Sequence, residues 1–216
     1  MNADGTNVQT VFPLSSLPGS LFISGLSWSP DGSQLAFSAF RSRTNSFKLF
    51  VVDVAGTALT RLSSSADNDT NPSWSPDGTQ IAVESYPGRT GLHGDIVLIQ
   101  VSDESRTPLV TAGSTGQPDW SPDGSAIAFT KTIDGIPDLF RVDAGGGTPT
   151  RLTATPSRFE FNPAWSPDGT LIVFAKLSPR SGPEDLWTIS STDGSGPTQI
   201  TDTPNRGEIQ PDWQVG

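Results

Sequence analysis

The sequence of 216 residues contains no cysteine and only one histidine, His93. Without cysteine the chain can form no disulfide, no thiolate metal site and no thiol nucleophile. A serine-hydrolase triad needs a histidine beside a serine on a strained turn, and the sequence has no Gly-x-Ser-x-Gly turn. We therefore expect no catalytic residue, no cofactor and no metal in this chain.

Basic residues and long apolar runs are also scarce. Thirteen Lys+Arg stand against 23 Asp+Glu, which gives a formal net charge of −10 and a pI of about 4.3. Such a surface repels the phosphates of nucleic acid, so we expect no nucleic-acid partner. No apolar run approaches the roughly 18 residues that cross a bilayer, and the opening residues MNADG lack a signal-peptide pattern. We expect no membrane insertion.

What the sequence has instead is glycine, proline and a repeated phrase. Trp-Ser-Pro-Asp-Gly occurs four times, and a truncated copy, Pro-Asp-Trp, follows near the C-terminus; the tryptophans are Trp28, Trp74, Trp120, Trp165 and Trp213. Successive tryptophans lie 45 to 48 residues apart. This period is the size of a propeller blade and differs from the periods of TPR, ankyrin and leucine-rich repeats.

Each repeat is predicted to contain four short strands. The first strand ends at the tryptophan, and Ser-Pro-Asp-Gly then forms a tight turn, in which Gly accepts a positive φ. The second strands are apolar at successive residues, which indicates cover on both faces; the fourth are polar, which suits an edge. The predicted second, third and fourth strands are 35–37, 48–52 and 59–62; 81–83, 95–99 and 107–110; 127–129, 138–142 and 150–153; 171–174, 185–189 and 198–201.

These units predict an all-β fold. No segment has a helical apolar period with caps, so we expect almost no helix. Four-stranded units that cannot cover their own faces stack radially into a β-propeller. We predict one domain over 1–216 with four complete blades, near 24–66, 70–112, 116–155 and 161–203, and with the repeated tryptophans in the core between blades.

The ends of the chain predict a partial fifth blade. Residues 2–11 match residues 191–200, so 1–14 are expected to supply an outer strand and 209–216 an inner strand. Three alternatives remain open: a fragment of a five- or six-bladed ring with Met1 as an internal residue, a complete chain that closes imperfectly, and closure through a second copy. An open ring exposes strand edges, so self-association is expected.

The Trp-Ser-Pro-Asp-Gly phrase, followed by an Ile-Ala-Phe-like strand and an Asp-Leu-Phe-like strand, resembles the WD40-like PD40 repeat of TolB-type β-propellers. The resemblance covers nearly the whole chain. It implies a non-enzymatic propeller that docks a protein or peptide, in a periplasmic or secreted location. Because similar blades serve several functions, two alternatives stay open: an accessory propeller of a prolyl-oligopeptidase-like peptidase, and a carbohydrate-binding or lyase propeller.

The repeats differ most in the loops that join second to third strands and fourth to next first strands. In a propeller these loops project from one face, the usual binding surface. Aromatic and arginine side chains there belong to the types enriched at protein interfaces. The predicted binding face consists of Phe22, Arg41, Arg43, Tyr86, Arg89, His93, Arg158, Phe159, Phe161 and Arg180. For His93 the alternative is a solvated loop histidine.

Two groups of carboxylates have a structural explanation. The aspartates of the repeated phrase, Asp31, Asp77, Asp123 and Asp168, all occupy one turn position, so turn formation is expected to account for them. Asp67-Asn68-Asp69 offers oxygen ligands that suit calcium but lacks the spacing of an EF-hand loop. We expect a polar turn there.

Overall fold

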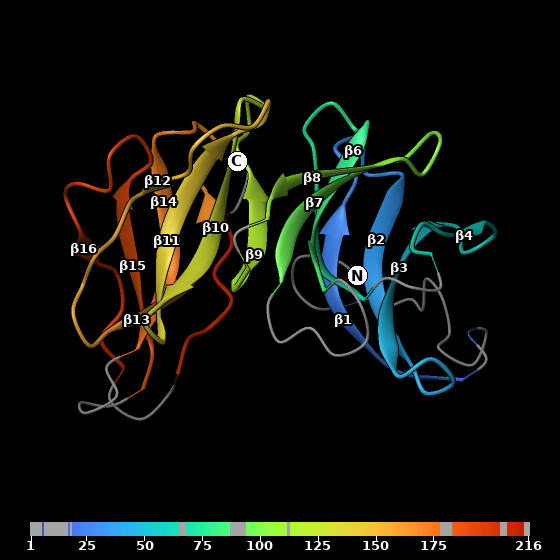
Figure 1. Ribbon diagram of the computed structural model, residues 1–216, viewed down its shortest axis with the longest axis horizontal. Helices are drawn as coiled ribbons and strands as arrows, with labels where there is room; N and C mark the ends of the chain where they lie inside the picture. The colour runs from blue at the N-terminus through green and yellow to red at the C-terminus, as the bar shows by residue number, and fades with distance from the viewer. Residues whose placement is uncertain are drawn as a thin grey trace.

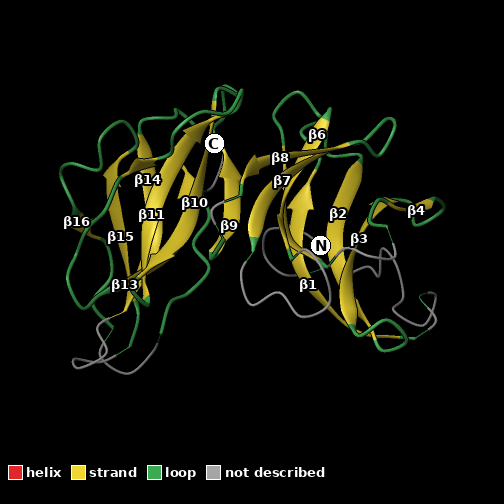
Figure 2. Cartoon of the chain, viewed as in Figure 1, coloured by secondary structure: helices red, strands yellow, loops and turns green. Residues whose placement is uncertain are grey.

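The computed structural model describes residues 6, 17, 19–64, 68–86, 94–111, 113–177, 183–203 and 207–213. Within these residues the chain forms four sheets of four strands each, and no helix (Figures 1 and 2). No helix in this part of the chain could therefore span a membrane. The strands are β1 (Ser20–Trp28), β2 (Gln34–Arg41), β3 (Ser46–Asp53), β4 (Leu59–Arg61), β5 (Asp69–Trp74), β6 (Gln80–Ser85), β7 (Asp95–Gln100), β8 (Arg106–Val110), β9 (Thr115–Trp120), β10 (Ala126–Ile133), β11 (Ile136–Asp143), β12 (Thr150–Arg151), β13 (Phe159–Trp165), β14 (Leu171–Leu177), β15 (Asp185–Ser190) and β16 (Thr198–Gln199).

Each sheet is an antiparallel meander in which strands consecutive in the sequence are neighbours. We call the sheets blades 1 to 4 in chain order; in Figure 1 they run from the blue β1–β4 on the right to the orange-red β13–β16 on the left. The prediction of four complete four-stranded blades is confirmed. The fourth strands β12 and β16 are two residues shorter than predicted at their C-terminal ends.

The first strands of the blades gather around a common space. β1 packs against β5, β5 against β9, and β9 against β13. Together with residues 210–212 they line a central cavity of about 560 Å³. Each of these strands carries a bulge three residues before its tryptophan, where the backbone has a positive φ; the residues are Gly25, Asn71, Gln117 and Asn162.

A hydrogen bond joins each first strand to the next. The side chain of the residue before each tryptophan accepts a hydrogen bond from the backbone N–H of the tryptophan in the following blade. Ser27 accepts from Trp74 at 3.1 Å, Ser73 from Trp120 at 3.3 Å, and Asp119 from Trp165 at 2.8 Å. Because the partners are 46 or 47 residues apart, these bonds fix the register between blades.

Most of the hydrophobic core lies between blades. Three clusters fill the three interfaces between described blades; Trp74 and Trp120 belong to the first two, and Trp165 packs against the third. A fourth cluster, which includes Phe37, Phe50 and Leu17, lies on the other face of blade 1. Trp74 is 6% exposed and Trp120 9%, but Trp28 is 57% exposed. The prediction that all the tryptophans lie in the core is therefore wrong for Trp28, because no described blade covers that face of blade 1 in the way that blade 1 covers Trp74; outside blade 1, the cluster on that face contains only Leu17 among the described residues.

The Ser-Pro-Asp-Gly turns have one geometry in all four blades. In blade 1, Ser29 Oγ donates to Asp31 at 2.7 Å, and Asp31 accepts the N–H of Ser33 at 3.0 Å. These bonds to the ionised form lower the pKa of Asp31 to about 2, and matching bonds do the same for Asp123 and Asp168. The corresponding bonds also lower the pKa of Asp77. The recurring aspartates thus have a structural role.

The partial fifth blade falls mostly outside the described residues. Of the expected outer strand, 1–14, only residue 6 is described. Residues 207–213 run beside β13, where Ile209 O accepts a bond from Asn162 Nδ2 and Trp213 Nε1 donates to Ala164 O at 3.1 Å. These described residues form no strand ladder with β13.

The turn glycines offer a matched test of contact between blades. Gly32 and Gly124 have φ of +70° and +71°, but a Cβ on Gly32 would meet nothing, whereas one on Gly124 would lie 3.2 Å from Pro76 Cγ. We expect Gly32→Ala to cost about 1–2 kcal/mol for its left-handed backbone and Gly124→Ala to cost more. Urea unfolding measures both, and equal costs would show that Pro76 moves aside freely.

The tryptophans provide a second test. Trp74→Ala should lower the free energy of unfolding by about 3–5 kcal/mol, because it empties a packed interface. Trp28→Ala should change it by less than about 1 kcal/mol, because exposed side chains contribute little. Urea unfolding of both variants checks this. Similar costs would mean that Trp28 is covered in solution.

Candidate functional site

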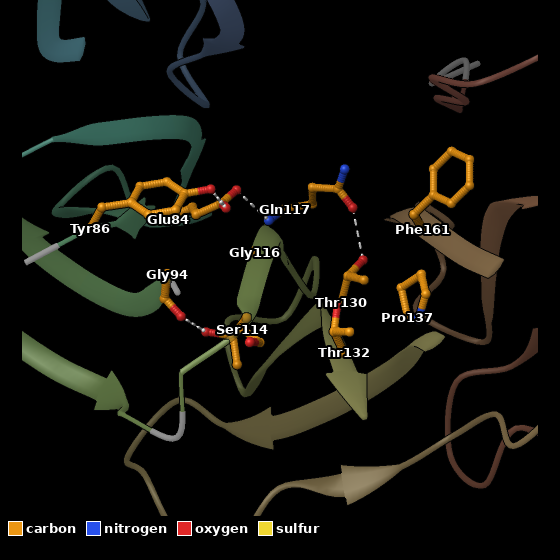
Figure 3. Close-up of a pocket in the computed structure, with 11 residues that line it drawn as sticks. Glu84, Tyr86, Gly94, Ser114, Gly116, Gln117, Thr130, Thr132, Pro137 and Phe161 are labelled. Atoms are coloured by element: carbon orange, nitrogen blue, oxygen red, sulfur yellow. Dashed lines mark hydrogen bonds between the residues drawn. The ribbon is translucent and has the colours of Figure 1, made fainter. Parts of the chain in front are cut away.

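A cavity of about 500 Å³ opens between blades 2, 3 and 4 (Figure 3). It lies at the end of the blades where the second-to-third-strand loops are found, since Tyr86 follows β6, Gly94 precedes β7 and Pro137 is the second residue of β11. This is the face on which the sequence predicts binding. The lining residues are Glu84, Tyr86, Gly94, Ser114, Thr115, Gly116, Gln117, Thr130, Thr132, Pro137 and Phe161.

The carboxylate of Glu84 is the polar centre of this cavity. Glu84 is buried on β6, and three neutral donors bind it: the Tyr86 hydroxyl, Asn71 Nδ2 at 2.7 Å and the N–H of Gln117 at 3.3 Å. Burial and the bond to this carboxylate raise the pKa of Tyr86, so its hydroxyl stays protonated and donates. These bonds hold Glu84 in one orientation against the cavity.

Blade 3 is shaped to receive the Glu84 side chain. A Cβ on Gly116 would lie 2.5 Å from the Glu84 carboxyl group, so no larger residue fits there while Glu84 keeps this position. Counted from the tryptophan of each repeat, the residues equivalent to Glu84 are Ser38, Thr130 and Ala175. An acid at this position of the repeat therefore occurs in blade 2 alone, and the glycine opposite it belongs to the same arrangement.

Gln117 links Glu84 to the last blade. Its side-chain oxygen accepts bonds from Thr130 Oγ1 at 2.8 Å and from the N–H of Asn162 at 3.0 Å, while its own N–H reaches Glu84. Its φ of +54° is uncommon for a residue with a long side chain. Because of this bulge, the backbone N–H of Gln117 faces blade 2 while its side-chain amide bonds within blade 3 and to blade 4. Gln117 thus joins the three blades beside the cavity.

Glu84 differs from three other buried acids of the described chain in its partners. Asp69, Asp138 and Glu160 are each fully buried and each pair with a cation, Arg106 at 2.8 Å, Arg151 at 2.5 Å and Lys176 at 2.9 Å respectively. No ion pair of the described residues includes Glu84. Its partners among the described residues are the three neutral hydrogen-bond donors alone.

A second unpaired acid, Asp119, lies in the central cavity. It accepts the N–H of Trp165 at 2.8 Å and the hydroxyl of Ser73 at 3.2 Å. Burial raises its pKa to about 7, and the nearby charge of Asp212 acts in the same direction. Asp119 therefore changes its protonation near neutral pH, which the exposed turn aspartates do not.

The predicted binding residues fall into three places. Tyr86 and Phe161 line the cavity from opposite sides (Figure 3). Phe22, half exposed, stacks on Phe40 with ring centroids 5.2 Å apart at the corresponding end of blade 1, where Arg41 and Arg43 also lie. Arg158 lines a smaller cavity with Lys176 and Trp187, next to Phe159 on blade 4. Arg89, His93 and Arg180 lie outside the described residues.

Sequence reasoning missed Glu84 and Gln117. An alignment of the repeats does contain a signal for Gln117, because Asn71, Gln117, Asn162 and Gln210 all stand three residues before a tryptophan. No such signal marks Glu84, which is a single acid among unlike residues. Its importance depends on Gly116 and Tyr86 lying next to it in space.

The cavity is lined by hydrogen-bonding groups and aromatic rings. No group of three or more His, Asp or Glu in the described chain could hold a metal ion. The two described residues of the calcium alternative are engaged elsewhere: Asp69 with Arg106 and Ser63, and Asn68 with the N–H of Phe47. What the cavity offers is a carboxylate, hydroxyl groups and two aromatic rings.

Comparison with protein families gives one match. The family model PD40, TolB beta propeller domain, matches residues 6–93 and 86–215. The two matched segments cover nearly the whole chain. A comparison with curated proteins gives no significant match.

Among solved structures the chain is similar to TolB from Acinetobacter baumannii, with a TM-score of 0.70, 23% identity and coverage of 84% of this chain and 44% of that chain. For putative TolB from Agrobacterium tumefaciens the TM-score is 0.69, with 22% identity and coverage of 81% and 63%. The chain thus spans less than two thirds of either. A prolyl endopeptidase structure is also similar, with a TM-score of 0.62, 15% identity and coverage of 88% and 30%. At these identities the likeness concerns the fold.

The raised pKa of Asp119 predicts a pH-dependent stability. The folded protein holds this proton up to about pH 7, whereas an ordinary aspartate releases it near 3.8, so ionisation of Asp119 destabilises the fold as pH rises from about 4 to 8. Asp119→Asn removes this titration and keeps an acceptor for Trp165. We expect the free energy of unfolding of Asp119→Asn to exceed that of the native protein by an amount that grows as pH rises through this range. By pH 8 the difference should be on the order of 1–3 kcal/mol, because each pKa unit corresponds to roughly 1.4 kcal/mol.

Urea unfolding at pH 4.5, 6 and 8 makes this comparison. Asp134→Asn, which changes an exposed carboxylate, is the control and should show no such trend. A constant difference between Asp119→Asn and the native protein at all three pH values would contradict a titration of Asp119 near neutrality.

Proposed function

Because the chain belongs to the PD40 family of TolB β-propeller domains, we propose that it is a non-enzymatic module that docks a protein or peptide. The docking surface is the face of the cavity lined by Tyr86 and Phe161, where the second-to-third-strand loops begin. The observation that carries this proposal is the cavity itself: 500 Å³ is within the usual size of a ligand site, and its few polar groups converge between aromatic walls.

Two further features support the same face. The half-exposed Phe22, with Phe40 and Phe47 beside it, adds an aromatic surface at the same end of blade 1. Arg41, Arg43 and Arg158 supply arginine, a residue type enriched with aromatics at protein interfaces. A cavity surrounded by aromatic and arginine side chains favours a polypeptide ligand. One side chain of the polypeptide can fill the cavity while the adjacent residues of the polypeptide cover the surrounding side chains.

The partial fifth blade belongs to the same proposal. Residues 1–14 and 209–216 are proposed as the two flanks of a closing blade, and the uncovered face of blade 1 with Trp28 as the surface on which another blade or a second copy packs. As part of the same proposal we expect a periplasmic or secreted location, which is what the resemblance to TolB-type propellers implies.

Selection from a random peptide display library, followed by calorimetric titration of the enriched peptides, tests the docking function. Phe161→Ala, alone or combined with the milder change Tyr86→Phe, should lower the affinity of the selected peptides by at least about tenfold. Loss of an aromatic anchor that is buried at an interface typically costs about 2 kcal/mol or more. Val54→Ala truncates an exposed apolar side chain just after β3, at the opposite end of its blade, and should leave affinity unchanged.

Three results would count against the proposal. No enrichment of any peptide would argue against docking. Equal losses in Phe161→Ala and Val54→Ala would move the docking surface elsewhere. Cleavage of bound peptides, detected as a change in mass, would favour the peptidase alternative.

A further inference from the structure

We propose that the cavity beside Glu84 is a receptor for a positively charged group, the guanidinium of arginine or the ammonium of lysine. The cation is a side chain of the docked peptide, and in that respect the inference rests on the proposed function. The cation site itself depends only on the residues around Glu84.

The first step is the missing counter-charge. A buried carboxylate is costly unless it is paired and hydrogen-bonded. The three fully buried acids Asp69, Asp138 and Glu160 meet this requirement with an arginine or lysine at 2.5–2.9 Å. Glu84 has hydrogen bonds but no ion pair among the described residues. A ligand that brings a cation would supply the pairing that the chain supplies at the other three.

The second step is the space next to the carboxylate. Glu84 borders a cavity of about 500 Å³, and the three donors that hold it are neutral, so none of them repels an arriving cation. The threonine hydroxyls of Thr130 and Thr132 stand on the neighbouring wall (Figure 3). Hydroxyl oxygens accept hydrogen bonds, and a guanidinium carries five N–H donors in a fixed fork.

The third step is the aromatic pair. Tyr86 and Phe161 stand on opposite sides of the cavity (Figure 3). A cation over an aromatic face is attracted by the ring, and more strongly so when it is desolvated. The protein already uses this contact at Lys176, whose Nζ lies 4.8 Å from the ring centroid of Trp187 while it pairs with Glu160. A carboxylate and an aromatic ring thus bind a lysine of this protein together at that place.

The overall charge favours the same ligand class. The formal net charge of −10 attracts cations and repels anions over distances beyond the cavity. A neutral side chain would fill the space but leave the Glu84 charge unpaired. An acidic side chain would meet both the repulsion of Glu84 and that of the whole surface.

The test uses a small ligand so that no partner needs to be known. N-acetyl-Gly-Arg-Gly-amide and the same peptide with citrulline in place of arginine are nearly equal in shape, but only the first carries a charge. Calorimetry or NMR titration at low ionic strength should give an affinity at least tenfold higher for the arginine peptide. Salt should weaken its binding and leave citrulline binding almost unchanged. Equal affinities for the two peptides would overturn the proposal.

Variants then locate the charge. Glu84→Gln should reduce the preference for arginine over citrulline to less than about threefold. Asp103→Asn, an equal change of charge at an exposed residue of the β7–β8 loop, at the opposite end of blade 2 from the cavity, should leave the preference intact. Phe161→Ala keeps Glu84 and its donors and should weaken arginine binding several-fold. A full preference in Glu84→Gln, with the loss appearing in Asp103→Asn instead, would assign the effect to the general surface charge.

The two proposals fail in different ways. If Glu84→Gln is unstable in a thermal melt, the comparison of arginine with citrulline on the native protein still decides the matter. Display peptides that bind at Phe161 without enrichment of arginine or lysine would refute the cation site and leave docking in place. Binding of the arginine tripeptide without any enriched display peptide would refute docking and leave the cation site.

Discussion

Each four-stranded sheet of this protein has apolar side chains on both faces, and neither face can be covered from within the sheet. Ile81, Ala82 and Val83 follow one another on β6 and are all fully buried, although alternate residues of a strand point to opposite faces. Cover therefore has to come from the blades before and after. Radial stacking satisfies this requirement at each interface, and the exposed Trp28 marks the face where no described blade supplies it.

The same stacking brings the first strands together, and the polar groups of the site follow from that convergence. Strands that meet around a cavity cannot all keep a regular ladder, and the bulges at Asn71, Gln117 and Asn162 interrupt it three residues before each tryptophan. The released side chains bond across blades, as Gln117 does to Asn162. Packing of the blades thus comes first, and the hydrogen-bond network is arranged by it.

The candidate site arises where the repeats stop being alike. Glu84 and Gly116 have no counterparts of the same kind in the other blades, and they fit each other across one interface. The repeated residues, by contrast, make turns and core. Since many functions share this fold, the non-repeated residues are the ones that set the candidate site apart from the rest of this propeller.

The sequence by itself determined the features that depend on contacts close in the chain: the blade period, the strand pattern and the Ser-Pro-Asp-Gly turns, whose bonds in blade 1 join residues two to five positions apart. Loop position alone also assigned Tyr86 and Phe161 to one face, and both line the cavity. Only the tertiary structure decided the polar site, because the bond between Glu84 and Gln117 spans 33 residues and depends on the bulge and on the offset of the blades. Likewise one repeated phrase gives buried tryptophans in blades 2 and 3 but the exposed Trp28 in blade 1. The neighbouring blades determine which residues of a blade are buried and which border a cavity. No local sequence pattern reveals those neighbours.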